Sequence, residues 1–540
     1  MSLNAPFGRA VDSDSSRSEH PKQQSSLLSK TLICLMALST LSLNACLSHL
    51  FLEVPQDHQQ AFLFGVEQSQ SERYELSTRA AWRYLSNTNE EDPRYDRALR
   101  LLARGAEKLG LSYAASAWYL QIASAQRDVT LIPEAVEGIQ RIVERGVFDE
   151  DALINRYIAV EELSTMGASI DSFVHYYQGL HDLRQGEDRW AKRRFRQIHP
   201  ESEYIDQARY VIAVQKVAMN QLSDAEARFE KIARRLAPDL ESANAVGSVS
   251  SSKPSTASDD RPRKVHLEQS PLSKQLWRDA MTSLARLAMQ KGDATTALRY
   301  FEVVRERVPD DPSLLLEIAW AHFQKGSPRR ALGFLLALDA PIYNALIAPE
   351  RFILEAMTYR SLCQFGPARQ AAVRLSDRYR EALNDLYNGV LPERSDALRK
   401  AASQRGDLLS ISQFIASLDR EVELIKSRAG LFGSKFTEAL LSLYAQGKAS
   451  AMARRERTLR VEIKRLTDEL LSAEEGVRLI THELGVALLR GRKPPKGRGP
   501  VPPVGEIAES SQVVYSFNGE FWTDELDELI VAAEDRCIDQ

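Results

Sequence analysis

The sequence predicts an all-α fold: a solenoid of repeated helix pairs, then a long helical hairpin and a small C-terminal module. Glycine and proline are scarce, at 26 and 22 of 540 residues, whereas 44% of the residues are hydrophobic. In the middle of the chain, small, turn-forming and large apolar residues recur with a period of 34. Beyond residue 395, heptad spacing replaces this period. Such a composition disfavours a turn-rich β-sandwich, a collagen-like fibre and a wholly disordered chain.

The overall charge indicates protein partners and not nucleic acid. The chain has 70 basic and 74 acidic residues, a formal net charge of −4. A near-neutral chain has no general attraction for nucleic acid or for an anionic surface, so either would need a local patch. One local cluster, Arg189–Arg196, combines basic residues with Trp190 and Phe195. On the 34-residue register it falls on a second helix, whose outer side faces solvent and whose Phe195 belongs to the core.

The N-terminus has the features of a secretory signal. Basic residues Arg17, Lys22 and Lys30 precede Thr31–Leu43, 13 residues without a charge, and the segment ends at Cys46. The last four residues, Leu-Asn-Ala-Cys, resemble a bacterial lipobox. That resemblance implies a segment 1–46 made of a signal peptide and its lipobox-like end, with cleavage before Cys46 and a lipid on Cys46.

The same segment allows two other interpretations. The stretch Thr31–Leu52 is 22 residues long and contains only His49 as a potentially charged side chain, which is long enough for a membrane span. It would then anchor the chain in the inner membrane, or the head could be disordered on a cytosolic chain. In lipobox families, Asp after the cysteine favours retention at the inner membrane. Because Leu47 stands there, the resemblance implies the periplasmic face of the outer membrane.

Four cysteines exclude a disulfide-framework protein. If Cys34 leaves with the signal and Cys46 is lipidated, Cys363 and Cys537 remain. An oxidising compartment would permit their pairing, but sequence does not place them within disulfide reach. One buried thiol and one tail thiol is the expectation.

The period of 34 defines the repeats. In the copy at 281–309 it comprises a small residue at a helix crossing, a turn glycine, a second small residue, a large apolar residue and a helix-stopping proline. The equivalent residues of four copies are Gly179, Gly186, Ala191 and Phe195; Ala213, Asn220, Ala225 and Phe229; Ala285, Gly292, Ala297 and Phe301; and Ala319, Gly326, Ala331 and Leu335. A fixed period of this kind indicates a solenoid.

These residues resemble the tetratricopeptide repeat (TPR), a helix–turn–helix unit of 34 residues. The resemblance covers about 300 residues with degenerate copies, in two blocks, 78–241 and 269–390, after a linker and first helix at 47–77. The Ser-rich segment 242–268 between the blocks predicts a disordered linker. An earlier copy would pair a helix around Trp82 with one around Ala98. A later copy, with Gly366 and Ala371, implies six inserted residues.

Residues 396–490 predict a coiled coil in the form of a helical hairpin. Two heptad runs, 408–425 and 459–487, lie on either side of Gly430 and Gly433. We expect this hairpin to pack on itself or on the last repeats. The alternative is a homodimer through the same seam.

The end of the chain differs in kind. Residues 491–505 form a Pro-rich basic linker, and residues 506–540 an aromatic and acidic module. The segment Val513–Trp522 alternates around Asn-Gly, which predicts a β-hairpin, and Thr523 caps a predicted acidic helix. Phe517, Phe521 and Trp522 would form a docking element on a tether, or pack back as a C-terminal cap, with equal support.

No enzymatic, metal or cofactor signature is present in the sequence. Glycine–lysine pairs lack the upstream glycine of a phosphate-binding loop, and no G-x-S-x-G elbow occurs. His482 and Glu483 lie on a predicted helix, but Val486 stands where a zinc protease has its second histidine. We therefore expect no cofactor and no catalysis.

The TPR resemblance implies a function in protein binding, because inner helices of such repeats line a concave groove. Simple packing against the next repeat is the alternative for Tyr176 and Trp320. The lysine, asparagine and arginine clamp of cytosolic co-chaperones is missing. A lipid-anchored scaffold for an envelope assembly is the first hypothesis, and a cytosolic or inner-membrane-anchored regulatory adaptor the second. At the positions of this chain that match the inner helices of the family, the residues expected to line the groove are Tyr176, Arg184, Tyr210, Arg286, Gln290, Trp320 and Gln324.

Overall fold

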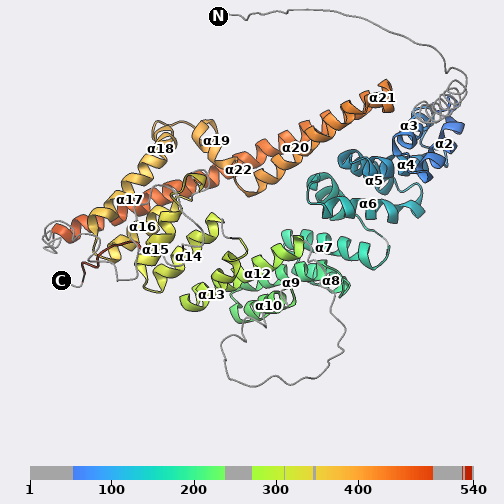
Figure 1. Cartoon of the computed structure of the whole chain (residues 1–540). Helices are drawn as coiled ribbons and strands as arrows, with labels where there is room; N and C mark the ends of the chain where they lie inside the picture. The colour runs from blue at the N-terminus through green and yellow to red at the C-terminus, as the bar shows by residue number, and fades with distance from the viewer. Residues whose placement is uncertain are drawn as a thin grey trace, which may run out of the picture.

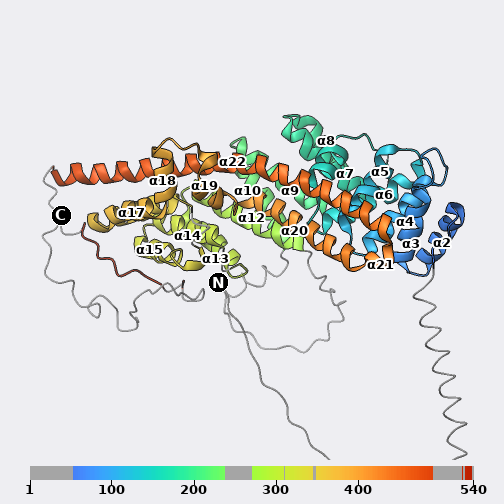
Figure 2. The ribbon, with the colours of Figure 1, turned by 90° about the horizontal axis from the view of Figure 1, so that it is seen from above.

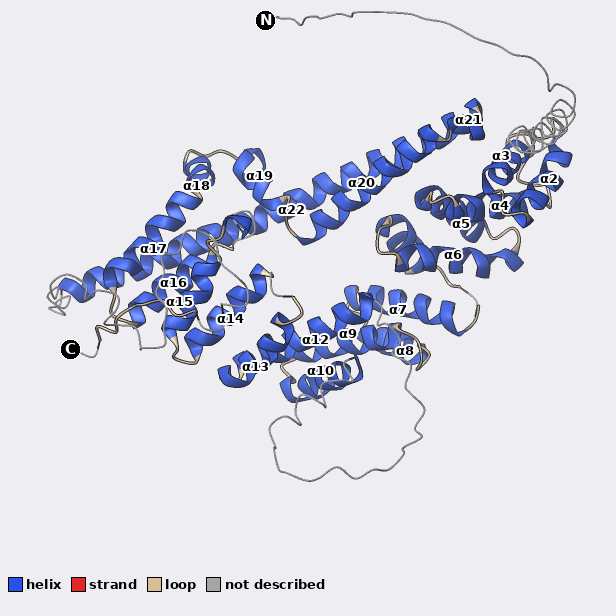
Figure 3. Ribbon diagram, in the orientation of Figure 1, coloured by secondary structure: helices blue, strands red, loops and turns tan. Residues whose placement is uncertain are grey.

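The computed structural model describes residues 53–163, 165–236, 271–308, 311–343, 348–489, 526 and 529–537. Within these ranges all regular secondary structure is helical, which confirms the all-α prediction (Figure 3). The signal segment with Cys46, the linkers and the predicted β-hairpin with Phe517, Phe521 and Trp522 lie outside the described residues. Among the helices that are described, none is both long and apolar enough to cross a membrane.

The solenoid consists of consecutive helix pairs (Figure 1). Short 3₁₀ helices, η1 (Val129–Leu131) and η4 (Pro341–Tyr343), lie in two of the connections, and the second member of the third pair is a π-helix. The pairs are α2 (His58–Gln70) and α3 (Tyr74–Leu85), α4 (Tyr95–Lys108) and α5 (Ser112–Ala125), α6 (Ile132–Glu144) and η2 (Asp151–Ile158), α7 (Ala168–Arg184) and α8 (Asp188–Gln197), α9 (Tyr204–Ala218) and α10 (Leu222–Leu236), α12 (Pro271–Gln290) and α13 (Ala294–Arg305), α14 (Pro312–Gln324) and α15 (Pro328–Ala337), and α16 (Glu350–Ser361) and α17 (Phe365–Arg378).

Each turn inside a pair contains one residue with a left-handed backbone conformation, which ends the first helix. Glycine adopts positive φ at little cost, and Gly292 and Gly326 have φ of 82° and 79°. Seven residues before this position a small residue lets the two helices approach closely, as Ala285 and Ala319 do. The left-handed residues of the eight pairs described above are Glu72, Gly110, Gly146, Gly186, Asn220, Gly292, Gly326 and Cys363.

These turns correct the sequence register at both ends of the array. In the last pair the turn residue is Cys363, with φ of 55°, and Gly366 lies inside α17. The 37 residues from Gly326 to Cys363 exceed the period of 34 by three, so the insertion is three residues and not six. In the first pairs, the tight turns follow α2 and α4. The helix around Trp82 therefore belongs with the helix before it, and residues 87–93 connect two repeats.

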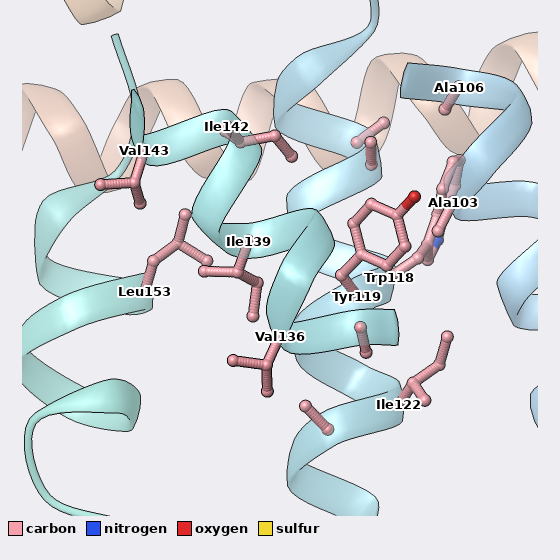
Figure 4. Packing of buried hydrophobic residues seen from close by; sticks show 14 of the residues in the cluster. Ala103, Ala106, Trp118, Tyr119, Ile122, Val136, Ile139, Ile142, Val143 and Leu153 are labelled. Atoms are coloured by element: carbon pink, nitrogen blue, oxygen red, sulfur yellow. The ribbon is translucent and has the colours of Figure 1, made fainter. Parts of the chain in front are cut away.

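One apolar core runs through the first repeats. Figure 4 shows side chains from α4, α5, α6 and η2 in this core, among them Tyr119 and Ile122 of α5 and Val136 and Ile139 of α6. All four are almost fully buried. Because each pair leaves apolar surface uncovered, neighbouring pairs stabilise one another, as in other solenoids.

The two blocks of repeats stack as one superhelix although residues 237–270 separate them in sequence. Phe229 of α10 shares a buried cluster with Trp277 of α12. The hydroxyl groups of Tyr210 and Ser283 lie 3.2 Å apart, within hydrogen-bond distance. The sequence does not determine whether the two blocks form one superhelix, and these contacts show that they do.

The predicted helical hairpin follows the solenoid. After α18 (Arg380–Tyr387), η5 (Pro392–Arg394) and α19 (Asp396–Ala402), it consists of α20 (Gly406–Ser427), the short α21 (Ala429–Phe432) and α22 (Ser434–Leu489). The 56 residues of α22 form one continuous helix, about 84 Å long at 1.5 Å per residue. Gly433, with φ of 79°, makes the sharp connection before it.

The hairpin packs on the solenoid at both ends of the arc, as Figures 1 and 2 show. Near α21 it contacts α3 and α5, where Phe436 stacks on Trp82 with ring centroids 5.2 Å apart. The second half of α22 covers α16, α17 and α19. Its heptad residues from Leu459 to Leu484 are buried there, so α22 caps the last repeat. The seam proposed for a homodimer is thus occupied within the chain.

The C-terminal tail returns to the solenoid. Residues 529–537 contain no helix, so the prediction of an acidic helix after Thr523 is wrong over these residues. Leu526 and Ala533 are buried in the core of α12–α16. Cys537 forms a disulfide with Cys363, with the two Cα atoms 5.1 Å apart. The expectation of two separate thiols is therefore wrong, because folding brings together residues 174 positions apart.

Candidate partner-binding surface

The first helices of neighbouring pairs lie side by side and form the inner side of the arc. In Figure 1, α7, α9 and α12 lie toward the hairpin, and α8, α10 and α13 lie on the outer side. Contacts between consecutive first helices hold this surface together. Arg286 of α12 makes two hydrogen bonds, of 2.8 and 2.6 Å, with the carboxylate of Glu317 on α14. Gln324 of α14 donates to the carbonyl oxygen of Met289 at 3.1 Å.

The three predicted aromatic residues are half-buried and pack within the repeats. Tyr176 lies 5.4 Å, centroid to centroid, from Tyr204 of the next repeat, and burial raises its pKa to about 12. Tyr210 contacts Phe229. Trp320 lies edge-on to its neighbour Phe323, and its indole N–H is buried without a hydrogen-bond partner. Tyr176 therefore packs against the next repeat, which was the alternative given for it, whereas the ring contact of Trp320 is within α14.

The four predicted polar residues are exposed. Arg184, Gln290 and Gln324 all stand two residues before the turn residue of their repeat, at the end of a first helix. Arg184 donates to the side-chain oxygen of Asn155 at 3.1 Å. Arg286 is 63% exposed, and its hydrogen bonds with Glu317 raise its pKa. These four side chains are accessible to a partner.

Between these polar positions lies a stripe of apolar residues, of which sequence reasoning named only Trp320 as lining the groove. Its members stand six or three residues before the left-handed turn residue, a position that recurs in every repeat. Most are half-buried, and Val214 is 45% exposed. The repeat spacing could have identified them, since six before Gly186 gives Leu180 and six before Asn220 gives Val214. We call this set the inner stripe: Leu180, Leu183, Val214, Val217, Met289, Trp320 and Phe323.

A polar contact that the sequence did not predict joins the hairpin to the first repeats. Glu421 of α20 accepts a hydrogen bond from the Tyr113 backbone N–H at 3.1 Å and a short one from the Tyr444 hydroxyl. The carboxylate thus lies at the N-terminus of α5. Burial raises the pKa of Glu421 to about 7, although its hydrogen bonds oppose that shift. Gly447 permits this arrangement, because a Cβ there would lie 2.3 Å from the Tyr113 ring.

The remaining candidates are less informative. Phe195 is buried, and Arg189, Trp190, Arg193 and Arg196 are exposed, which confirms the expectation of a solvated outer helix.

In the described part of the chain, no group of three or more His, Cys, Asp or Glu residues could hold a metal ion. A pocket of about 680 Å³ lies between the start of α16 and α22, and its lining carries both acidic and basic side chains.

The repeated geometry decides the type of solenoid. Each pair has a left-handed turn residue, and the turn residues are 34 apart from Gly186 to Asn220 and from Gly292 to Gly326. This geometry is similar to that of a tetratricopeptide-repeat solenoid. No protein-family model and no curated protein matches the sequence.

Two solved structures give partial matches. One is a tetratricopeptide repeat protein from Parabacteroides merdae, at 12% identity and a TM-score of 0.23, covering 67% of this chain and 100% of that one. The other is a circular tandem repeat protein with a novel repeat topology, at 12% identity and a TM-score of 0.14, covering 80% of this chain and 97% of that one. Both are similar as helical repeat proteins, but at these scores the assignment depends on the internal period of this chain.

Proposed function

We propose that this TPR solenoid is a non-catalytic scaffold that binds protein partners through the inner stripe. The observation that carries the proposal is the row of half-buried apolar side chains along α7, α9, α12 and α14, bordered by Arg184, Gln290 and Gln324. Flexible Met289 and aromatic Trp320 and Phe323 suit the apolar face of a partner helix. The hairpin supports this use, since it joins both ends of the arc and limits changes of its curvature.

We further propose that the scaffold is a lipoprotein, anchored through Cys46 at the periplasmic face of the outer membrane. The Cys363–Cys537 disulfide supports an oxidising compartment, because such bonds are rare in the cytosol. In that location it would organise an envelope assembly for outer-membrane protein insertion, secretion or pilus biogenesis, or motility. The alternative is a regulatory adaptor that is cytosolic or held by an inner-membrane span.

Replacing Cys46 by Ser tests the anchor. A lipoprotein loses its acyl chain with this change, and it then leaves the outer-membrane fraction for the soluble one. The measurement is fractionation of envelopes together with mass spectrometry of the N-terminal peptide. If wild-type protein carries no acyl chain, or if Cys46→Ser remains with the membrane, the lipid anchor is refuted and a span is favoured.

A pair of matched double variants tests the inner stripe. Val214→Glu with Gln290→Glu places two carboxylates on the inner side, whereas Ala227→Glu with Gln197→Glu places two carboxylates at exposed positions of outer helices. Each change at an exposed position alters stability by about 0.5 kcal/mol or less. We expect at least tenfold lower recovery of envelope partners by the inner variant alone. Equal recovery by both variants would refute the inner stripe as the binding surface.

A further inference from the structure

The C-terminal tail is bound to the solenoid as an extended peptide. The Val531 N–H donates to the Arg329 carbonyl oxygen at 3.3 Å, and the Arg536 N–H donates to the Leu362 carbonyl oxygen at 3.0 Å. Between them, the Gln364 side-chain amide donates to the Glu534 carbonyl oxygen at 2.7 Å. Hydrogen bonds to a peptide backbone, with apolar residues inserted alongside, are a common mode of peptide recognition.

The surface below the tail differs at Gly333 from the same surface in four other repeats. Seven residues after the turn residue, α8, α10, α13 and α17 carry the exposed residues Arg193, Ala227, Arg299 and Gln370. At this position α15 has Gly333, which is buried. A Cβ on Gly333 would lie 2.7 Å from the Leu529 carbonyl oxygen. The missing side chain therefore makes room for the tail backbone.

The second difference is at the turn itself. Cys363 occupies the left-handed position that is Gly or Asn in the four preceding pairs. A left-handed conformation is unfavourable for a residue with a Cβ. Glycine would avoid this strain, but only cysteine can form the bond to Cys537. Two positions of the repeat thus depart from their neighbours, and both departures serve the tail.

We propose that Leu526 and residues 529–537 form a strap that occupies a peptide-binding site on α15 and the α16–α17 turn, and that the Cys363–Cys537 disulfide latches it there. A dithiol opens the latch by thiol–disulfide exchange. Its first thiolate attacks one sulfur and releases the other as a thiol. Its second thiolate then attacks the reagent's own sulfur in the mixed disulfide and releases the second cysteine, which leaves two protein thiols and one oxidised, cyclic dithiol. Both cysteines are half-buried, so the bond is within reach of a reductant.

Release of the strap uncovers apolar surface. Leu526 and Ala533 are buried, and Leu529 and Val531 pack against the same core. The surface that they leave fits a second extended segment with apolar residues in the same spacing. The closed disulfide excludes such a segment, because a covalently held strap competes at very high effective concentration. The strap therefore makes this site dependent on redox state.

Hydrogen exchange on the full chain tests the latch. We expect reduction by dithiothreitol, or Cys363→Gly, to raise the exchange rates of the Val531 and Arg536 amides at least tenfold. The glycine variant suits the left-handed turn, so the turn itself remains intact. Gly333→Ala should also release the strap while it raises the helix propensity of α15. Gly366→Ala, with open space around it, is the matched control. If these amides stay protected after reduction, the latch is refuted.

A peptide added in trans tests the site. The probe is a fluorescent peptide with the sequence of residues 523–540 and Cys537→Ser. The acceptor is the full chain with Leu529→Ser, Val531→Ser and Cys537→Ser, whose own strap is weakened. We expect at least tenfold tighter binding to this variant than to the oxidised wild type. If the variant binds no better although its strap is released, the disulfide is only a structural link and the binding site is refuted.

Discussion

Replacing Phe436 by Ala is expected to release the hairpin from the first repeats. The side chain is 3% exposed, and its ring lies 5.2 Å from Trp82, 5.4 Å from Phe432 and 6.5 Å from Trp118. Truncation of a buried phenylalanine lowers the free energy of unfolding by about 3–5 kcal/mol, because the lost contacts and the cavity both contribute. The lost free energy weakens mainly the interface between the hairpin and the first repeats, since a solenoid is stabilised by contacts between neighbours.

Urea unfolding and hydrogen exchange measure this effect. We expect a first unfolding phase at lower urea, with faster exchange in α3, α5, α20 and α21 and little change in α12–α15. Leu431→Ala is the control, because Leu431 lies in the adjacent short helix α21, next to Phe432, but is 43% exposed. Its change should stay within about 0.5 kcal/mol. Equal losses from the two variants, or faster exchange confined to α22, would contradict the assigned role of Phe436.

The second large effect concerns pH. Burial raises the pKa of Glu421 from an ordinary value of 4.5 to about 7. In the unfolded chain the carboxyl ionises near pH 4.5, whereas in the folded chain it holds its proton up to about pH 7. The folded state therefore binds more protons between these values, and stability falls as the pH rises through this window. Above pH 7 the loss amounts to about 3 kcal/mol.

Glu421→Gln should remove this dependence. The amide oxygen can still accept from the Tyr113 N–H, and no charge forms in the buried site. We expect the variant to be more stable than the wild type at pH 8, by up to about 3 kcal/mol, and equal to it near pH 4. The control is Glu423→Gln, two residues away on the same helix, whose side chain is 72% exposed and should have little effect. A wild-type stability that rises between pH 5 and 7 would refute the assignment.

Four repeats were predictable because glycine or asparagine stands at their turns. Gly186, Asn220, Gly292 and Gly326 identified four helix pairs, and all four are present. Gly110 and Gly146 also stand at turns but were not recognised, because the period is not 34 in the first repeats. The register also failed where a residue other than glycine or asparagine adopts the left-handed conformation. Cys363 does so because a disulfide holds it, and Glu72 does so in the first pair. The identity of a side chain indicates only which backbone conformations are low in energy, and tertiary contacts can impose a less favourable one.

The candidate site was predictable in part. The exposed polar residues Arg184, Gln290 and Gln324 follow from the helix period and the position of the turn. The aromatic residues did not remain free, because a large apolar side chain such as Tyr176 packs against the nearest apolar surface. Whether that surface belongs to the next repeat or to a partner depends on the stacking of helices, which no single repeat encodes.

By itself, the sequence determined local structure: the helix pairs, their period of 34 and the amphipathic faces of α20 and α22. These features depend on residues within one or two turns of each other, where periodicity reports the buried face directly. Only the tertiary structure decided that α22 caps the last repeat, that Glu421 meets the start of α5, and that the tail binds α15 and closes a disulfide with Cys363. Those contacts join segments far apart in sequence, and apolar periodicity shows that a face must be covered but not what covers it.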